Sequence, residues 1–515
     1  MNLSTSKLGG MTRRDFFKGS GAAAVALGAG GAALGRSPYA LAQQVSGGGT
    51  VHEAARDIKV FGEADVVVVG GGPGGVGAAV AAARAGAKTV LIERYGYLGG
   101  MGTGGLVTII PNMSDVTGKL QIAGICKEWI DRLDARNATD HPKKEEWGSA
   151  DPKLVSYWQN RSMFCVRMNR VEYSAHIDAE ISKCILNDMA QEAGVKTYLH
   201  ALGTEPIMEG NVAKGVVFES KSGRQAILAK VVIDSTGDGD LLPYTPAKFE
   251  MQMHPGMRIT SLALVFWVAN VDLKKLTEFK ETQREKFEEQ DQELLKLGGQ
   301  PGYLTSNIKD QDSLLWFHNR YRNKSQIDVE ELTRVEMDGR KSMLITHDYR
   351  KKNTPGFEHS FIVLTAPQLG TRGSRRVIGD YQLTAKDMPC DDPFHDTVAV
   401  FPNVDTSDTF PVVVIGNDSA KDHPLFYVPY RSLIPAGVDN MLIACRAFSS
   451  DQTVQEYFNL IPHCLAFGQA AGTAAALAIK SGVNLRKVDI AALQASLSEQ
   501  GVPLPSRGEL MSAKR

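Results

Sequence analysis

The sequence predicts an α/β fold built on parallel strands, and three consecutive features support this prediction. An apolar strand, Val66–Val69, runs directly into a turn of five glycines and one proline, Gly70–Gly75. A helix follows, and a second apolar strand, Lys88–Glu93, ends in an acid 18 residues after Gly75. A strand, a tight turn, a helix and another strand form the repeating unit of a parallel sheet.

The glycine turn has the spacing Gly-x-Gly-x-x-Gly, which in this context binds a dinucleotide. Gly70 permits the tight turn, Gly72 lets the backbone approach a pyrophosphate, and Gly75 allows close packing of helix and strand. The helix that begins near Pro73 points free N–H groups and its positive dipole end at that pyrophosphate. Glu93 is placed to accept hydrogen bonds from the adenosine ribose. The sequence therefore predicts a dinucleotide site.

Residues 1–42 have the organisation of an export signal. Thr12–Lys18 reads TRRDFFK, a twin-arginine signature; a glycine- and alanine-rich stretch follows, and Ala40–Ala42 offers a cleavage site. The stretch is a poor membrane span, which needs about 20 mostly apolar residues. The alternative is a basic N-terminus before a flexible linker. We expect the twin-arginine machinery to export the folded chain to the periplasm, with residues 43–57 as a linker.

Composition excludes several classes of function. The net charge is −1, which gives no electrostatic reason to expect nucleic acid as a partner. No second long apolar run appears, so we expect no membrane span in the mature chain. The six cysteines include no Cys-x-x-Cys pair, which argues against zinc, an iron–sulfur cluster and covalent haem. We expect no metal.

The remainder of the first predicted domain, residues 58–245, contains further strands and glycines. Six glycines from Gly96 to Gly105 imply backbone wrapped closely around a ligand. Val171–Gly194 has helical periodicity. Three segments read as strands: Lys196–His200, Val212–Ser220 and Gln225–Asp234. The last of them runs into a second glycine–acid turn, so its end is expected at the ligand edge of the sheet.

Residues 246–424 differ in charge and pattern from the segments on either side. We interpret them as an inserted α+β substrate or cap domain. Val271–Leu297 is densely charged and predicts a solvated amphipathic helix, with partner binding as the alternative. A second helix is predicted over Asp328–Lys352. Residues 425–515 return to the dinucleotide-binding fold with a buried strand, Asn440–Ala444, and a small-residue helix, Pro462–Ile479. The small residues suit either approach to a flat ligand or tight helix–sheet packing.

Several ordered motifs resemble a known family. DVVVVGGGPGGVGAAVAAARAG, VLIERYGYLGGMGTGG, KVVIDSTGDGDL, GTRGSRRVIGDYQLT, YVPYRSLIPAGVDNMLIACR and GQAAGTAAALA occur in order between Asp65 and Gly482. They resemble FAD-dependent oxidoreductases with the glutathione-reductase-type flavin fold, related more distantly to fumarate reductase flavoproteins. The resemblance implies a Rossmann-like FAD-binding domain and FAD as the cofactor.

The resemblance also implies cofactor-binding positions. In such proteins the glycine turn and the acid hold the ADP half, the turn after the later strand lies along the pyrophosphate, and the last helix points its N-terminus at the flavin, stabilising negative charge there. The corresponding positions are Gly70, Gly72, Pro73, Gly74, Gly75, Glu93, Arg94, Gly99, Gly100, Gly104, Gly237, Asp238, Gly468 and Gly472.

One position departs from the family pattern. Ala444-Cys445-Arg446 stands where the family has Ala-Gly-Arg after the late strand. Cys445 is a small apolar filler, a redox-active thiol or the site of a covalent flavin link. The first alternative is favoured because Cys464, the nearest cysteine in sequence, is 19 residues away and no resolving partner is evident.

Catalytic candidates follow from what hydride transfer needs, which is an anchoring cation and a proton donor or acceptor. Arg372 and Arg376, with Arg375, form a cluster that suits a substrate carboxylate or carbonyl, with structural ion pairing as the alternative. Arg446 follows the late strand and is a further candidate. His463 stands at the start of the last helix, as a proton shuttle or a structural histidine.

Two classes of function remain. The first is an exported flavoenzyme that oxidises a small organic substrate as a dehydrogenase or oxidase, or reduces a C=C bond as fumarate reductases do. The second is a flavin-bearing electron-transfer subunit. A second Gly-x-Gly-x-x-Gly turn for NAD(P)H does not follow a strand elsewhere, so we expect oxygen, a quinone or a redox protein as the external electron acceptor or donor.

Overall fold

The computed structural model describes residues 44–45, 51–53, 55–305, 314–387, 392–402, 425–513 and 515. The chain divides into two compact units, Met1–Asp57 and Ile58–Arg515. In the first unit β1 (Gln44–Val45) and β2 (Val51–His52) form an antiparallel pair. The expected signal peptide, residues 1–42, lies outside the described residues, as does Cys390.

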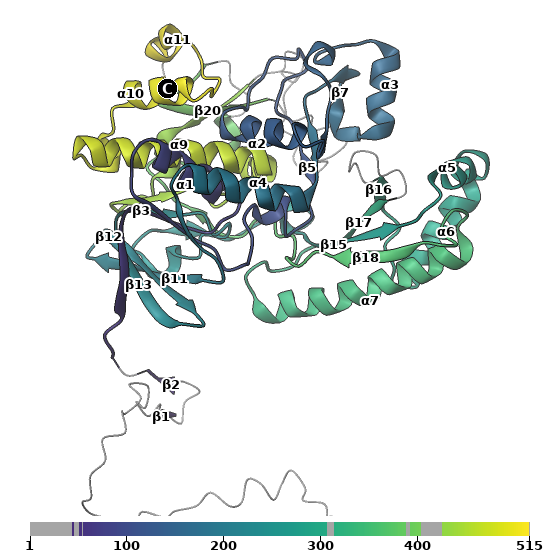
Figure 1. The fold of residues 1–515 in the computed structure, drawn as a ribbon, viewed down its shortest axis with the longest axis horizontal. Coiled ribbons are helices and arrows are strands. Elements are labelled where there is room, and N and C mark those ends of the chain that lie inside the picture. The colour runs from purple at the N-terminus through teal and green to yellow at the C-terminus, as the bar shows by residue number, and fades with distance from the viewer. Residues whose placement is uncertain are drawn as a thin grey trace, which may run out of the picture. The chain divides into compact units, whose positions relative to one another are not determined.

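The second unit is built around a sheet of seven strands whose centre is parallel (Figure 1). Its parallel strands lie in the order β10 (Lys196–Tyr198), β4 (Thr89–Ile92), β3 (Lys59–Val69), β13 (Gly223–Asp234) and β22 (Met441–Ile443). The first half of β13 pairs antiparallel with β12 (Val212–Ser220), which pairs with β11 (Leu202–Glu209). The predicted α/β fold with a parallel sheet is confirmed.

The apolar run of β3 serves both faces of this sheet. Val66 and Val68 belong to a core that contains α1 (Pro73–Arg84) and α9 (Ile461–Ser481). Val67 and Val69 belong to a second core on the opposite face, because side chains alternate along a strand. Both faces are buried, which explains why the strand is a continuous run of valines.

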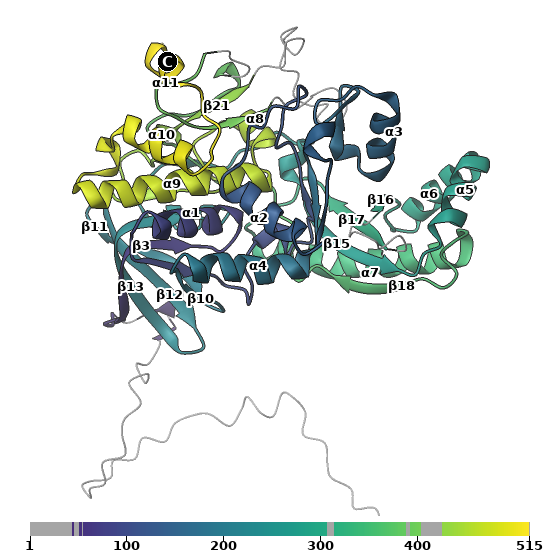
Figure 2. The ribbon, with the colours of Figure 1, turned by 45° about the horizontal axis from the view of Figure 1, so that its top comes forward.

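Helices α1 and α9 lie side by side over the sheet, with α4 (Ala179–Glu192) and α2 (Ile125–Asp134) next to them (Figure 2). Helices α10 (Ile490–Glu499) and α11 (Arg507–Ser512) follow α9. Among the described helices, none combines the length and apolarity that a membrane crossing requires.

The predicted helix over Val171–Gly194 is wrong in its first third. The Asp178 side chain accepts hydrogen bonds from the N–H groups of Glu180 and Ile181, so α4 begins at Ala179. The preceding residues form strands instead. The smaller elements of this region are β5 (Ile109–Ile110), β6 (Thr139–Asp140), α3 (Pro152–Arg161), β7 (Val166–Arg167), β8 (Arg170–Val171) and β9 (Ala175–Ile177).

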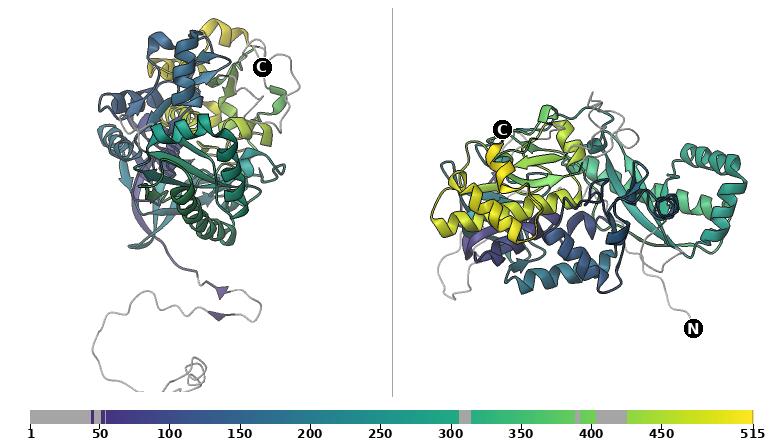
Figure 3. Two further views of the ribbon diagram at one scale, coloured as in Figure 1. Left: turned by 90° about the vertical axis from the view of Figure 1, so that its right-hand side faces the viewer. Right: turned by 90° about the horizontal axis from the view of Figure 1, so that it is seen from above.

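The inserted segment folds around its own sheet and extends from one side of the seven-stranded sheet (Figure 3). Its antiparallel strands have the order β16 (Tyr303–Thr305), β17 (Leu315–Tyr321), β15 (Leu262–Ala269) and β18 (Phe361–Thr365). Helices α5 (Leu273–Thr282), α6 (Arg284–Lys296) and α7 (Val329–Asn353) accompany this sheet. The single helix predicted over Val271–Leu297 is two helices, because Gln283 leaves the helical conformation at φ −132°.

The insertion returns to the main body earlier than the predicted boundary at residue 424. β14 (Phe249–Glu250) pairs with β19 (Arg376–Val377), where the insertion leaves and rejoins the main body. β20 (Thr397–Phe401), which pairs with β21 (Phe426–Pro429), lies in the same hydrophobic core as α9. Residues 397–401 therefore pack with the main body, around α9, rather than with the inserted sheet.

Candidate functional site

The glycine turn between β3 and α1 is shaped by close backbone approaches. Gly70 has φ +99°, and a Cβ there would lie 2.4 Å from the carbonyl oxygen of Ser235. At Gly74 a Cβ would lie 1.8 Å from the Ala444 oxygen, and at Gly75 it would lie 1.7 Å from the Gly70 oxygen. A Cβ at Gly72 would meet no atom within 4 Å. Three glycines are thus required by the fold, and the chain leaves the space beside Gly72 open.

Glu93 closes this turn from the end of β4. Its carboxylate accepts hydrogen bonds from the N–H of Gly71 at 2.6 Å and from the N–H of Tyr95 at 2.7 Å. Burial raises the pKa of Glu93, although both backbone hydrogen bonds act in the opposite direction. The acid therefore fixes the turn directly, in addition to the ribose contact expected of it.

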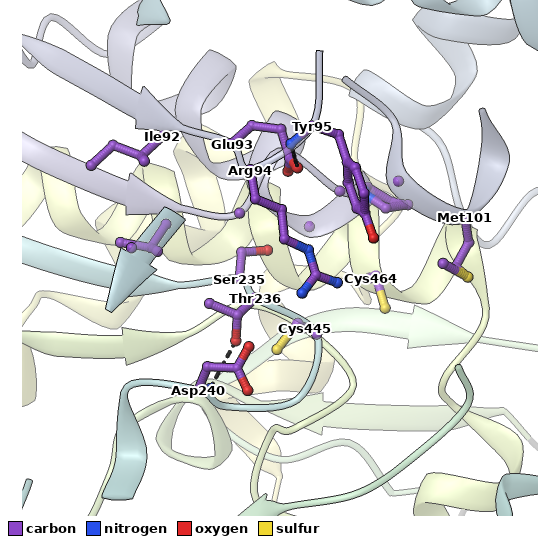
Figure 4. Close-up of a pocket in the computed structure, with 18 of the residues that line it drawn as sticks. Ile92, Glu93, Arg94, Tyr95, Met101, Ser235, Thr236, Asp240, Cys445 and Cys464 are labelled. Carbon is purple, nitrogen blue, oxygen red and sulfur yellow. Dashed lines mark hydrogen bonds between the residues drawn. The ribbon is translucent and has the colours of Figure 1, made fainter. Parts of the chain in front are cut away.

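A pocket lies above the turn, at the carboxyl ends of the parallel strands (Figure 4). Nine of the predicted site residues line it: Gly70, Gly72, Pro73, Gly74, Glu93, Arg94, Gly100, Gly237 and Arg446. In Figure 4 the Arg94 side chain points into the pocket. Gly100 approaches the turn closely, since a Cβ there would lie 2.9 Å from the Gly72 Cα.

Six of the predicted cofactor residues do not line the pocket, and five of them are glycines. Gly75 packs against Gly70 within the turn. A Cβ at Gly99 would meet Thr103 at 2.6 Å, and one at Gly104 would meet the Tyr97 ring at 2.2 Å. Gly468 and Gly472 face α1, where a Cβ would lie 2.0 Å from the Gly74 oxygen and 2.1 Å from the Ala78 oxygen, respectively. These two glycines of α9 therefore serve tight packing, although against helix α1 rather than against the sheet that the alternative interpretation named.

The side chain of Asp234 holds the second glycine–acid turn through hydrogen bonds. Its carboxylate accepts hydrogen bonds from the N–H and hydroxyl of Thr236 and from the N–H of Leu241. Burial raises the pKa of Asp234 to about 6. Asp238 is the sixth predicted cofactor residue outside the pocket wall, and its carboxylate accepts from the Ser374 hydroxyl at 2.6 Å and from Arg446 at 2.7 Å.

Cys445 and Cys464 both line the pocket (Figure 4). The argument that Cys445 has no second cysteine near it was wrong, because α9 brings Cys464 to the same pocket wall across the 18 intervening residues. Burial raises the pKa of Cys464 to about 11 and that of Cys445 well above its usual value. Both are therefore thiols at neutral pH, which suits the apolar-filler interpretation and disfavours a reactive thiolate.

Sequence reasoning missed three groups of pocket residues. Ala201–Gly203 follow β10, and their place at the end of a parallel strand is a signal that was available. Thr236 and Asp240 lie in the recognised second turn. Gln368 and Thr371 come from the segment between β18 and β19, and no local pattern marks them.

The arginines of the TRGSRR segment have different surroundings. Arg375 forms an ion pair with Asp240 at 3.0 Å, and Arg376 donates to the Gln252 carbonyl at 2.7 Å. Arg376 is 1% exposed and thus has a structural role in this fold. Arg372 has no acid partner among the described residues, and its Nη2 lies 3.3 Å from His318 Nε2. Of these three arginines, Arg372 is the one that forms no ion pair with an acid among the described residues.

The other two catalytic candidates, Arg446 and His463, differ in their surroundings. Arg446 lines the pocket and donates from Nη2 to Asp238 and to the Thr371 hydroxyl, both at 2.7 Å. His463 is fully buried, with its ring centroid 4.3 Å from that of Phe401. Neither ring nitrogen has a hydrogen-bond partner among the described residues. This placement offers His463 no route for a proton.

A parallel sheet, a glycine turn over a helix N-terminus and an acid at the next strand define a dinucleotide-binding protein. The family model described as FAD dependent oxidoreductase matches residues 65–497. The chain belongs to this family, and it is an FAD-dependent enzyme.

Individual relatives are distant. Dihydrolipoyl dehydrogenase of Trypanosoma brucei brucei is 56% identical over 45 residues, so the match spans only 9% of each chain. A geranylgeranyl bacteriochlorophyll reductase-like protein from Thermoplasma acidophilum is 12% identical, with 87% of this chain and 89% of that chain covered and a TM-score of 0.39. A p-nitrophenol 4-monooxygenase from Pseudomonas putida is 11% identical, with 85% and 88% covered and a TM-score of 0.41.

The pocket fits the FAD of this family. The open space beside Gly72, next to the N-terminus of α1, suits the pyrophosphate, and Glu93 suits the ribose. No group of three or more His, Cys, Asp or Glu side chains among the described residues is arranged to hold a metal ion.

Proposed function

We propose that this enzyme oxidises a small organic substrate, as a dehydrogenase or an oxidase. FAD, when bound, accepts a hydride equivalent at N5. The observation that carries the proposal is that Gln368 and Thr371, from the inserted segment, form part of the wall of the cofactor pocket. The insertion therefore contributes to the wall of the pocket that would hold FAD.

Hydrogen bonds fix the segment between β18 and β19 at the wall of the cofactor pocket. Gln368 donates its backbone N–H to the Gly104 carbonyl at 3.1 Å. The Thr371 hydroxyl accepts from Arg446, and the Ser374 hydroxyl donates to Asp238 at 2.6 Å. These contacts tie the insertion to the glycine-rich segment Gly96–Gly105 and to the second glycine–acid turn. A substrate bound under the insertion would consequently be held in a fixed orientation, and orientation is a large contribution to catalysis.

The experiment uses the FAD-loaded protein under anaerobic conditions. Small organic molecules are screened for loss of the oxidised flavin absorbance, and the reduced protein is then mixed with oxygen in a stopped-flow instrument. Fast reoxidation supports an oxidase, and slow reoxidation that quinones or dyes accelerate supports a dehydrogenase. Reoxidation by an activated C=C compound alone would favour a reductase of the fumarate-reductase type. A flavin that no small molecule reduces, but a redox protein does, would favour an electron-transfer subunit.

We further propose that the enzyme acts in the periplasm after twin-arginine export. The support is the TRRDFFK segment, the glycine- and alanine-rich stretch and the cleavage site at Ala40–Ala42. Changing both Arg13 and Arg14 to Lys should abolish export. N-terminal sequencing of the periplasmic protein should find a start near Gln43. An intact Met1 on a cytoplasmic protein would contradict the proposal.

A further inference from the structure

Arg372 stands one residue beyond the cofactor pocket and faces the inserted sheet. Its neighbour Thr371 lines the pocket, and the N–H groups of Arg372 and Gly373 both donate to Gln326 Oε1. Gln326 in turn donates to the Ile259 carbonyl. The backbone of Arg372 is thereby fixed, while the Nε atom of its buried guanidinium has no hydrogen-bond partner among the described residues.

His318, which contacts the Arg372 side chain, cannot neutralise the charge of the guanidinium. A guanidinium only donates hydrogen bonds, so the contact of 3.3 Å between Arg372 Nη2 and His318 Nε2 requires that this nitrogen accepts. His318 therefore carries its proton on Nδ1 and is neutral. Burial, followed by the charge of Arg372, lowers the pKa of His318 well below its usual value, which agrees with the neutral form.

Two further arginines, Arg320 and Arg258, lie near Arg372. Arg320 lies two residues after His318 on β17, so both side chains share one face of the inserted sheet. Its partner across the sheet, Ala263, exchanges two hydrogen bonds with Gly370 at 2.9 and 2.7 Å, which brings the Arg372 segment beside it. Arg258 and Arg320, after burial itself, hold the pKa of Arg372 well below its usual value.

Among the described residues, Glu456 is the one carboxylate whose charge acts on Arg372, and it is already engaged. Glu456 accepts from the N–H of Arg258 at 2.7 Å and from the N–H of Ile259 at 2.8 Å. The side chain of Arg258 donates to Asn459 at 2.9 Å and to the Glu456 carbonyl. Among the described residues, neither Arg372 nor Arg320 forms an ion pair with an acid, so two positive charges lie near each other in excess, and that of the buried Arg372 is costly without a counter-charge.

We propose that Arg372 and Arg320 form an oxyanion site that binds a carboxylate or phosphate group of the substrate, with Arg372 as the principal contact. The bound anion would offset the excess charge, and the guanidinium fork of Arg372 suits two oxygens of one group. The position beside Thr371 places the anchored end of the substrate next to the cofactor pocket. This inference rests on the proposed function, because it names the substrate class of the same site.

The test is calorimetric titration of the FAD-loaded protein with succinate and, separately, with inorganic phosphate. Succinamide is the uncharged control. We expect one of the anions to bind and succinamide not to bind. Arg372→Gln should weaken the anion by about tenfold or more, because a charge-assisted contact is lost. Arg340→Gln, which removes a charge from the outer surface of α7, should leave affinity unchanged.

Arg320→Gln provides a second variant whose fold is safe, because Arg320 is exposed. We expect it to weaken the anion less than Arg372→Gln does, but more than Arg340→Gln. Preference for succinate or for phosphate identifies the group that the substrate carries. Affinity equal to wild type in both Arg372→Gln and Arg320→Gln would overturn the inference, as would the binding of neither anion.

Failure of this inference differs from failure of the proposed function. If small neutral molecules reduce the flavin and Arg372→Gln changes neither anion affinity nor KM, the oxidation proposal stands and the oxyanion site is overturned. If the anions bind through Arg372 but no small molecule reduces the flavin, the site stands and the oxidation proposal fails.

Discussion

Glu93 uses both carboxylate oxygens to hold backbone N–H groups of the loop that it closes. In Glu93→Gln one of these oxygens becomes an NH₂ group that faces an N–H donor. We expect this change to loosen the turn and weaken FAD binding about tenfold, since an unsatisfied buried donor costs roughly 1–3 kcal/mol.

The measurement is the FAD dissociation constant of the apoprotein, from quenching of flavin fluorescence. Glu63→Gln is the matched control, because Glu63 is an exposed acid on β3 of the same sheet. Equal affinities in the two variants would show that Glu93 does not support the cofactor site.

His463 makes a pH-dependent contribution to stability. Burial lowers its pKa to about 3, from the ordinary value of 6.5. The unfolded chain therefore binds the proton more tightly than the folded chain, so the free energy of unfolding is level above pH 6.5 and falls as the pH drops below it. The loss approaches about 1.4 kcal/mol per pH unit.

His463→Leu removes this group and should flatten the decline in stability between pH 6.5 and 5, as measured by urea unfolding. We expect kcat to remain close to wild type, because the imidazole has no polar partner among the described residues. A large fall in kcat in a folded variant would restore the proton-shuttle hypothesis.

Helices α1 and α9 pack closely against each other through their backbones. A Cβ at Gly468 would lie 2.0 Å from a backbone oxygen of α1, which no side-chain rotation relieves. We expect Gly468→Ala to destabilise the protein by several kcal/mol, since the two helices must separate. Thermal unfolding of the FAD-loaded protein measures the effect.

Gly508→Ala is the control for helix propensity. Gly508 lies in α11, and a Cβ there would meet no atom within 4 Å. Alanine is favoured over glycine in a helix by about 1 kcal/mol, so this variant should be as stable as wild type or slightly more stable. If both variants behave alike, the close approach of α1 and α9 is not a source of stability.

The sequence predicted the elements that carry strong local patterns. The valine run of β3, the strand β12 and the helix α7 have periodicity or composition that one segment reveals alone. β11 was missed because Pro206 and two glutamates interrupt its pattern. It is an edge strand, where proline is tolerated since one side needs no ladder hydrogen bonds.

The candidate site was predictable where its residues follow strands in sequence. The two glycine turns and Glu93 belong to that group, and nine predicted residues line the pocket. Cys464 and Thr371 reach the pocket through long-range packing, which local patterns do not encode. Gly468 and Gly472 were assigned to the cofactor because small residues permit close approach to any flat surface, and here that surface is another helix.

At the scale of the whole molecule, cofactor binding is coupled to folding. The pocket is assembled from strand ends and loops distant in sequence, from Val69 to Cys464, so the unfolded chain has no such site. FAD at a hundred times its dissociation constant should raise the free energy of unfolding by about 2.7 kcal/mol. Thermal unfolding at increasing FAD concentration measures this, and a midpoint independent of FAD would contradict a site formed only by folding.

The central strand β3 is synthesised early, but its environment is completed very late. It pairs with β13, which ends at Asp234, and β13 pairs in turn with β22, which begins only at Met441. The helix that covers α1 begins at Ile461. A ribosome-bound chain shorter than about 480 residues consequently exposes the apolar face of α1 and an unpaired edge of β13. We therefore expect folding of this unit to finish after translation, with chaperones shielding the nascent sheet until the last hundred residues emerge.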